Sequence, residues 1–199
     1  MPTEISSNKN CTVFAVVLAA GRSRRFGRSK LLEGLDGETL VHRAARLART
    51  VCGDRTVLVT GYDSAAVRTA AGEAPQFVIV NDRYEQGMGV SIALATRAVA
   101  HVADALLLLF ADQPLVTAEH LGALVDEWGG ADDRVVATAY AGIQGPPVLF
   151  PRSAFGALGA LTGDEGAKRV LQDPVFDVRT VPFEDAAIDI DTPADLESL

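Results

Sequence analysis

Short, wholly apolar runs alternate along this chain with longer stretches in which apolar residues recur at three- and four-residue spacing. The run over residues 106–110 contains no polar residue, as expected of a central strand that helices cover on both faces of a parallel sheet. This alternation predicts a doubly wound α/β sheet. The expected strands are 13–18, 56–60, 77–80, 106–110, 135–138, 148–150 and 178–181, and the expected helices are 39–51, 64–71, 89–100, 117–128 and 166–171.

The length of the chain favours one domain. It has 199 residues, and domains commonly contain ~150. Hydrophobic residues make up 48% and charged residues 22%, which is typical of a globular domain and argues against general disorder. We expect residues 1–10, which are polar and unpatterned, to form a disordered tail, and residues 11–199 to form the domain.

The charge and the cysteines indicate the compartment and exclude some partners. The formal net charge of −8 disfavours binding to nucleic acid or to an anionic membrane surface. No apolar run approaches the ~20 residues that a membrane span requires. Cys11 and Cys52 form neither a disulfide framework nor a zinc-binding spacing, which fits a reducing environment. The sequence therefore predicts a cytoplasmic protein with no nucleic-acid or membrane partner.

A basic, glycine-bounded segment follows the first expected strand, at the sheet edge where doubly wound proteins bind ligands. Five of the 18 basic residues lie between Arg22 and Lys30, with glycines at positions 21 and 27. The spacing matches neither a Walker loop nor a dinucleotide fingerprint, so the positive charge comes from several side chains. Guanidinium and ammonium groups arranged in this way suit a triphosphate. The alternative is a solvated basic turn.

Acidic residues follow two other expected elements. Asp112 ends the apolar run at 106–110, where a carboxylate can bind Mg²⁺ together with substrate phosphates; the alternative is a turn former. Asp189 and Asp191 alternate with Ile188 and Ile190, which predicts both acids on one side of an extended segment and both isoleucines facing the core.

Three further features concern helix starts. Thr117 is expected to cap one helix, and Asp191 or Thr192 another that begins at Pro193. Gly87 and Ser91 lie where exposed N–H groups and a hydroxyl could contact a base or sugar, although a plain helix start explains them equally well.

In this order, the motifs resemble the nucleotidyltransferases of molybdenum cofactor maturation, and most closely the molybdenum cofactor cytidylyltransferases. The family's opening pattern, L-A-A-G-x-S-x-R-[MF]-G-x-x-K, corresponds to residues 18–30. The resemblance continues through Gly87-Met88 with Ser91, Asp112-Gln113-Pro114, Gly145-x-Pro147-Val148-Leu149-Phe150, Gly163-Asp164-x-Gly166-Ala167 and Asp189-Ile190-Asp191-Thr192-Pro193. It covers nearly all of the chain after residue 12.

The resemblance implies a single-domain, Rossmann-like nucleotidyltransferase fold, with a mostly parallel sheet, one antiparallel strand and helices on both faces. It implies catalytic roles for Arg25, Lys30 and Asp112, and Mg²⁺ as cofactor, bound by Asp112 and Asp189 with Asp191 as a less direct partner. The nucleotide-binding residues that it implies are Leu18, Ala19, Ala20, Gly21, Arg22, Arg25, Lys30, Gly87 and Ser91.

The activity implied by the resemblance is Mg²⁺-dependent transfer of CMP from CTP to the terminal phosphate of molybdopterin, with release of pyrophosphate. Guanylyl-transferring relatives usually have Gly where this chain has Ala20, and the extra side chain favours a pyrimidine. The implied partners are CTP or another nucleoside triphosphate, a molybdopterin-type acceptor, and, transiently, a molybdenum hydroxylase. Pro146 and Glu165 depart from the family pattern, in the region expected to meet the acceptor.

Three alternatives stay open at this point. One is a guanylyltransferase, or a cytidylyltransferase acting on another phosphorylated acceptor. A second is a non-catalytic nucleotide-binding protein, and a third is a protein that delivers the cofactor to a molybdoenzyme. The expected helical positions of His42, His101 and His120 predict surface or packing roles for the three histidines.

Overall fold

A computed structural model describes residues 11–23 and 25–199. The tail expected over residues 1–10, and Arg24 of the basic segment, lie outside this part of the chain.

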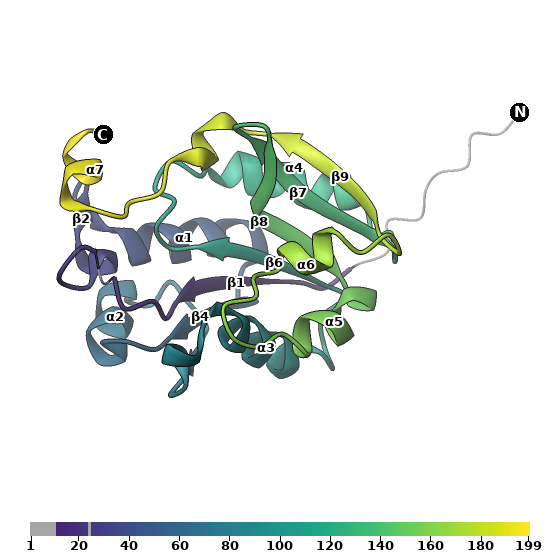
Figure 1. Ribbon diagram of the computed structural model, residues 1–199, viewed down its shortest axis with the longest axis horizontal. Coiled ribbons are helices and arrows are strands. Elements are labelled where there is room, and N and C mark those ends of the chain that lie inside the picture. The colour runs from purple at the N-terminus through teal and green to yellow at the C-terminus, as the bar shows by residue number, and fades with distance from the viewer. Residues whose placement is uncertain (1–10, 24) are drawn as a thin grey trace, which may run out of the picture.

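In this described part of the chain, seven strands form one sheet in the order β5-β4-β1-β6-β8-β7-β9 (Figure 1). Within the described residues, β8 runs antiparallel to β6 and β7, and the other neighbouring strands pair in parallel. The mostly parallel sheet with one antiparallel strand is therefore confirmed. The strands are β1 (Val13–Ala19), β4 (Thr56–Thr60), β5 (Phe77–Val80), β6 (Ala105–Phe110), β7 (Arg134–Tyr140), β8 (Ile143–Pro151) and β9 (Asp177–Pro182), with a separate hairpin of β2 (Gly34–Leu35) and β3 (Glu38–Thr39).

Helices cover both faces of the sheet, as the apolar central strands predict (Figure 1). Alternation along β1 sends Ala15 and Val17 into the core on one face and Phe14 and Val16 into the core on the other. The first core includes α1 (Leu40–Cys52), α2 (Ser64–Ala71) and α4 (Ala118–Trp128), and the second includes α3 (Met88–Val99), α5 (Phe155–Gly159) and α6 (Lys168–Leu171). The described residues also form a last helix, α7 (Pro193–Glu197), and four short 3₁₀ turns, η1 (Lys30–Leu32), η2 (Tyr84–Gln86), η3 (Arg152–Ala154) and η4 (Glu184–Ala187).

Side-chain caps fix where the helices begin. Thr117 accepts a hydrogen bond from the His120 amide at the start of α4, which confirms the expected cap. At α7 the cap is Thr192, followed by Pro193 in the first turn, and Asp195 completes a capping box.

Three expectations about local structure are corrected. Ile190 is fully buried, but Ile188 is 38% exposed, so the two isoleucines do not share the core. The physical reason is η4, whose turn places the Ile188 amide on the Asp185 carbonyl and interrupts the extended alternation. The helix expected over 166–171 is shorter, because α6 covers only Lys168–Leu171. The strand expected over 148–150 is longer, because β8 covers Ile143–Pro151.

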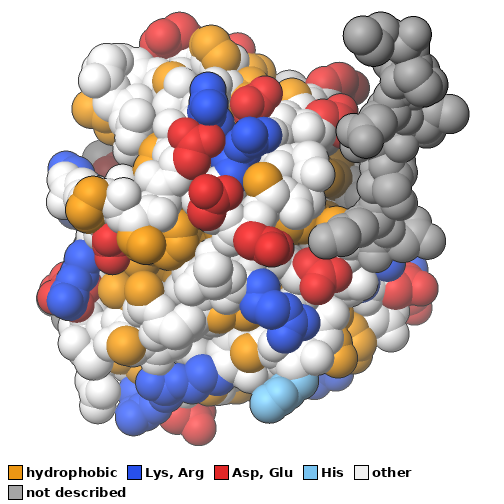
Figure 2. Space-filling model, turned by 90° about the vertical axis from the view of Figure 1, so that its right-hand side faces the viewer, with side chains coloured by type: hydrophobic (Ala, Val, Ile, Leu, Met, Phe, Trp, Pro, Cys, Tyr) orange, Lys and Arg blue, Asp and Glu red, His pale blue; other side chains and the backbone are white. Residues whose placement is uncertain are grey.

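The carboxyl ends of β1 and β6 point toward the same edge of the sheet, on the left of Figure 1, near the hairpin and α7. Figure 2 views the molecule from the side where β1 begins, and the described acidic and basic side chains on that face lie interspersed with apolar ones. None of the helices in the described ranges has the length and apolar character needed to cross a membrane.

Candidate functional site

A cavity of about 490 Å³ opens at the carboxyl end of the parallel strands. We call it the first cavity. Its walls come from the end of β1, from η2 and the start of α3, and from the turn after β6. The lining residues are Leu18, Ala20, Gly21, Arg22, Tyr84, Glu85, Gly87, Met88, Ser91, Phe110, Asp112 and Asp164. This set includes most of the residues predicted to bind the nucleotide, although Ala19 is buried and is not among them.

The basic segment is anchored at its centre by an aromatic side chain. Phe26 is buried against Leu40 of α1 and Ile190. Ile190 lies between Asp189 and Asp191, which we call the late acids. Gly27 adopts a φ of +80°, a left-handed conformation that favours glycine, and it turns the chain back toward the sheet. The Ser23 hydroxyl then accepts a hydrogen bond from the Lys30 amide at 3.2 Å. This packing brings residues 25–30 next to a segment about 160 positions later in the chain.

Lys30 lies at the centre of the resulting charge cluster. Its Nζ is 2.8 Å from Asp112 Oδ2 and 3.0 Å from Asp191 Oδ1, and its side chain is only 12% exposed. Burial lowers the pKa of the ammonium, but the two carboxylates outweigh that effect and raise the pKa above its usual value. Arg25 adds a second ion pair to Asp191 at 2.8 Å. The predicted catalytic residues Arg25, Lys30 and Asp112 therefore converge on one place.

The pKa of Asp189 is also raised, in this case chiefly by burial. Partial removal of its carboxyl from water raises its pKa to about 6, and the negative charges of Asp112 and Asp191 add to the rise, while Lys30 opposes it. A cation placed beside Asp189 would relieve both the burial of its carboxylate and the repulsion from Asp112 and Asp191. The sequence predicted Asp191 as an indirect metal partner, and its contacts in this structure are to Arg25 and Lys30.

The donor set fits a hard divalent cation that is shared with a ligand. In the described ranges, no group of three or more His, Cys, Asp or Glu side chains is arranged to hold a metal alone. Mg²⁺ commonly binds to one or two carboxylates and completes its coordination with phosphates and water. Asp112 and Asp189 supply two such oxygen donors, and Asp112 also lines the first cavity, where phosphates could reach it.

The remaining described cations of the basic segment are also paired with acids. Arg22 lies 2.8 Å from Glu85 and over the ring of Tyr62, so it reaches across the first cavity from the end of β1 to η2. Arg28 pairs with Glu33 on the outer side of the segment. The positive charge that the sequence assigned to a phosphate ligand is thus balanced by carboxylates from other segments.

The start of α3 is fitted closely against the loop that contains Asp164. Gly87 has a φ of +107°, and a Cβ at this position would lie 2.2 Å from the Gly163 carbonyl carbon. The Gly89 amide donates to the Gly163 carbonyl at 2.9 Å. Ser91 is buried, and its hydroxyl accepts a hydrogen bond from the side-chain amide of Asn81 at 2.9 Å. Glycine at 87 and 89 therefore allows this loop to close one wall of the first cavity.

A second cavity, of about 520 Å³, adjoins the first, and Met88 and Phe110 line both. Its walls are mainly apolar and come from β6, β7, β8 and α6. Lys168 is the one charged residue among those that line it. Tyr140 folds back over this wall, and its hydroxyl would be 2.3 Å from a Cβ at Gly145. The lining residues also include Ile92, Leu108, Gly142, Ile143, Gln144, Pro146, Val148, Gly166, Ala167, Leu171 and Gln172.

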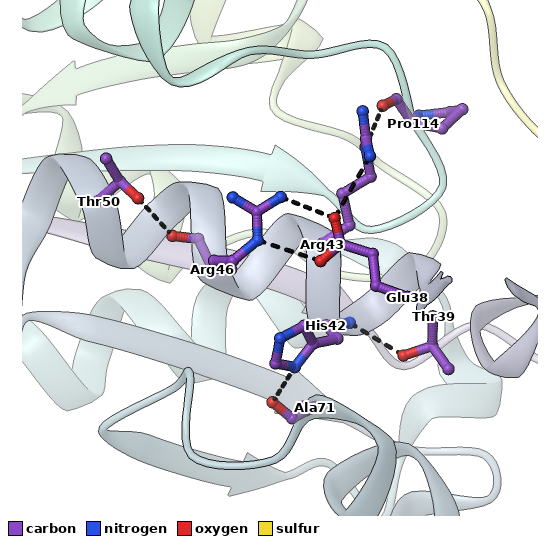
Figure 3. Close-up of polar contacts among 8 residues, drawn as sticks. All are labelled: Glu38, Thr39, His42, Arg43, Arg46, Thr50, Ala71 and Pro114. Atoms are coloured by element: carbon purple, nitrogen blue, oxygen red, sulfur yellow. Dashed lines mark hydrogen bonds and ion pairs between the residues drawn. The ribbon is translucent and has the colours of Figure 1, made fainter. Parts of the chain in front are cut away.

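A polar network on α1 supports the turn after β6 from outside (Figure 3). Arg43 donates from Nε to the Pro114 carbonyl at 2.7 Å and contacts Glu38 at 3.3 Å. Arg46 makes two hydrogen bonds to the same Glu38 carboxylate, at 2.7 and 3.1 Å. Nearby, His42 contacts the Ala71 carbonyl at 3.1 Å and so joins α1 to the end of α2. The turn that carries Asp112 is thus tied to the helix behind it.

Sequence reasoning missed several residues of the site. Tyr84, Glu85 and Asp164 line the first cavity but were not predicted to do so. Asp164 stands within a motif that carried the family resemblance, and that motif was the available signal. Tyr84 and Glu85 reach the cavity only through tertiary packing, so no local pattern marks them. Of the predicted residues, Arg25, Lys30 and Asp189 lie around the charge cluster and do not line either cavity.

Comparison with known proteins identifies a family and several related proteins. Residues 15–180 match the family described as "MobA-like NTP transferase domain". The chain is 32% identical over 168 residues to purine catabolism protein PucB of Bacillus subtilis, covering 80% of each protein. It is 31% identical over 191 residues to nicotine blue oxidoreductase of Paenarthrobacter nicotinovorans, covering 90% of this chain and 92% of that protein.

Among solved structures, Rv0371c from Mycobacterium tuberculosis superposes with a TM-score of 0.81 at 28% identity, covering 94% of this chain and 96% of that one. A further structure of Rv0371c is a complex with manganese; it has a TM-score of 0.76 at 28% identity and covers 94% of this chain and all of that one.

Proposed function

This chain belongs to the family of MobA-like NTP transferase domains and is a nucleotidyltransferase, and we propose that it transfers CMP from CTP to the terminal phosphate of a molybdopterin-type cofactor. Pyrophosphate is the second product. The observation that carries the proposal is the convergence of Lys30 and Arg25 with Asp112 and Asp191, which lie far apart in the chain. The family membership and the motifs shared with the molybdenum cofactor cytidylyltransferases support the choice of acceptor.

The reaction needs charge neutralisation more than proton transfer. The nucleophile is an oxygen of a phosphate that is already anionic; it forms a bond to the α-phosphorus of CTP as the bond to pyrophosphate breaks. Lys30 and Arg25 move their positive charge from the carboxylates to the triphosphate and stabilise the charge that develops on it. This requirement explains why cations and acids dominate the site, while the Cys52 thiol is buried elsewhere in the core, where burial raises its pKa to about 11.

Asp112 and Asp189 are the residues that would hold Mg²⁺, and Asp191 is a less direct partner. When bound, the ion would neutralise phosphate oxygens and help to orient them. The raised pKa of Asp189 supports this assignment, because burial and the negative charges of Asp112 and Asp191 both disfavour its anionic form when no metal is bound.

The first cavity is the proposed nucleotide site. The Leu18–Gly21 backbone, with Gly87 and Ser91, would contact the base and ribose, and Arg22 would exchange Glu85 for phosphate. Ala20 lines this cavity and is nearly buried, so its methyl group takes up space that a purine would need. The favoured base is therefore a pyrimidine, and the resemblance to the cytidylyltransferases makes cytosine our choice among them.

The second cavity is the proposed acceptor site. Its apolar walls suit a planar ring system better than a sugar, and its contact with the first cavity through Met88 and Phe110 would bring the acceptor phosphate toward the α-phosphorus. Pro146, one of the two departures from the family pattern, lines this cavity.

The test is a product assay with matched nucleotides. The purified protein is incubated with Mg²⁺, molybdopterin and CTP, GTP or ATP, and the dinucleotide and pyrophosphate are quantified. We expect the cytosine dinucleotide with equimolar pyrophosphate, and a rate at least about tenfold lower with either purine nucleotide. Equal use of GTP would overturn the base assignment. Transfer to sugar or polyol phosphates but not to molybdopterin would overturn the acceptor.

A further inference from the structure

The turn that carries Asp112 is held at three successive residues. The Asp112 carbonyl accepts a hydrogen bond from the Ile190 amide at 3.0 Å. The Pro114 carbonyl accepts one from Arg43, as Figure 3 shows. Between them, the side chain of Gln113 points inward and is bonded to two other segments. The position of Asp112 is therefore set by its neighbours along the turn as well as by its ion pair with Lys30.

Gln113 joins the turn to both of the other parts of the site. The residue is 5% exposed, and its Nε2 donates to the Ala186 carbonyl at 2.8 Å and to the Pro146 carbonyl at 3.2 Å. Pro146 lines the second cavity, and Ala186 belongs to η4, which leads directly into the segment with Asp189 and Asp191. Gln113 itself lines neither cavity. One amide thus connects the acid at the end of β6, the late acids and the wall of the second cavity.

The surroundings of this amide argue that it does more than fill space. The Gln113 amide lies close enough to Asp189 and Tyr140 to oppose the rise in pKa of both groups. Its Oε1 is buried and has no partner among the described residues. A buried amide oxygen without a partner is unfavourable, so filling space alone does not account for an amide at this position. What only the amide supplies is the pair of bonds between segments.

We propose that Gln113 is a positioning residue that fixes the spacing between the acid pair, Asp112 and Asp189, and the acceptor cavity at Pro146. The proposal rests on the proposed function, because it assigns the two cavities to the two substrates. In-line transfer requires the reacting atoms to be nearly in contact, and a displacement of ~1 Å can cost ~100-fold in rate. Gln113 therefore acts on turnover through Asp112 and Pro146, without touching nucleotide or acceptor.

The first test separates turnover from nucleotide binding. Gln113→Met keeps the length of the side chain and removes both donated hydrogen bonds. We expect kcat to fall by about 10- to 100-fold, while the KM for CTP stays unchanged because the residues proposed to contact the base and ribose are not altered. The matched control is Leu124→Ala, on the buried face of α4, which destabilises the core by leaving a cavity and lines neither of the two cavities. It should keep the wild-type kcat at temperatures where it is folded.

The second test does not depend on activity. Backbone amide exchange over residues 184–191 reports how firmly the late acids are held, since the Ile190 amide bonds to Asp112. We expect Gln113→Met to exchange about tenfold faster there and at the wild-type rate in β1. If Gln113→Met does not fold, Gln113→Asn replaces it, because its amide is one methylene too short to reach both carbonyls.

The outcomes distinguish the two proposals. Exchange over 184–191 at the wild-type rate, or a raised KM for CTP with unchanged kcat, would overturn the role of Gln113. A wild-type protein that transfers no nucleotide to molybdopterin would overturn the proposed function, and the exchange measurement would still decide whether Gln113 positions the acids.

Discussion

Removing the ammonium of Lys30 should have two opposite effects, one on catalysis and one on metal binding. Lys30→Met keeps the aliphatic stem and removes the charge that contacts Asp112 and Asp191. Turnover should fall by about 10²- to 10³-fold, the usual effect of losing one donor that stabilises transition-state charge. Divalent metal, in contrast, should bind more tightly when no nucleotide is present, because it no longer has to displace the ammonium from Asp112.

The size of the second effect follows from the exposure of the ion pairs. Exposed pairs contribute ~0–1 kcal/mol, and breaking a buried pair costs ~3–5 kcal/mol. The side chain of Lys30 is 12% exposed, but those of Asp112 and Asp191 are 25% and 37% exposed. Solvent screening therefore places the energy of these pairs between the two ranges, nearer to that of exposed pairs. A contribution of about 1.4 kcal/mol corresponds to tenfold in affinity. We therefore expect Mn²⁺ to bind to Lys30→Met about tenfold more tightly than to the wild type.

Two measurements without nucleotide check this expectation. Titration followed by the magnetic resonance signal of free Mn²⁺ gives Kd directly. In thermal melts, Mn²⁺ at ten times the wild-type Kd should stabilise the wild type by ~1.4 kcal/mol and the variant by ~2.7 kcal/mol. The difference raises the Tm of the variant by a further ~3–5 °C for a protein of this size.

The control is Arg28→Met, which removes one positive charge from the same segment but only breaks an outer pair with Glu33. It should leave both kcat and the Mn²⁺ affinity unchanged. If Lys30→Met binds Mn²⁺ no more tightly than Arg28→Met does, the ammonium does not compete with the metal, and the reasoning fails.

Three further predictions concern other parts of the molecule. Asp112→Asn should lose metal-dependent turnover while it stays folded; an unaltered Mg²⁺ titration would remove Asp112 from the metal site. Ala20→Gly should enlarge the first cavity and raise kcat/KM for GTP relative to CTP by about 10-fold or more, measured by competition of the two nucleotides. Burial lowers the pKa of His120 to about 4. Below pH 6.5, His120 becomes protonated in the unfolded chain before it does in the folded protein. The free energy of unfolding should therefore fall by up to roughly 3 kcal/mol as the pH drops from about 6.5 to 4. Denaturant melts at several pH values would show this slope, and His120→Gln should flatten it.

The fold was largely predictable because the sequence pattern of its strands differs clearly from that of its helices. A run such as 106–110, apolar at every position, is stable only between two layers of helices, and the structure places it as β6 in the centre of the sheet. The failures occur where neighbouring residues compete with the pattern. β8 continues through Gly145, Pro146 and Pro147, residue types that usually interrupt a strand, so only its apolar end was predicted.

The candidate site was predictable to the extent that it follows the carboxyl ends of strands. That rule brings the segment after β1 and the turn after β6 to one edge, and Lys30 and Asp112 meet there. The second cavity depends on β7, β8 and α6 packing together, and no local pattern reports such contacts. Gln113 looked like part of a short motif, and its two long-range hydrogen bonds appear only in the folded chain.

Asp191 shows why an acid's role cannot be inferred from alternation alone. The pattern predicted that Asp189 and Asp191 lie on one side of an extended segment, and the family resemblance implied that Asp191 is a less direct partner of the metal. In the folded chain, Phe26 packs against Ile190, and this contact draws the basic segment onto the second acid, so that Asp191 balances Arg25 and Lys30. An uncompensated cluster of cations would repel itself before any phosphate arrived. Asp112, which we propose as a metal ligand, thus also holds Lys30 in place, and we expect a metal-bound triphosphate to satisfy both sets of charges at once.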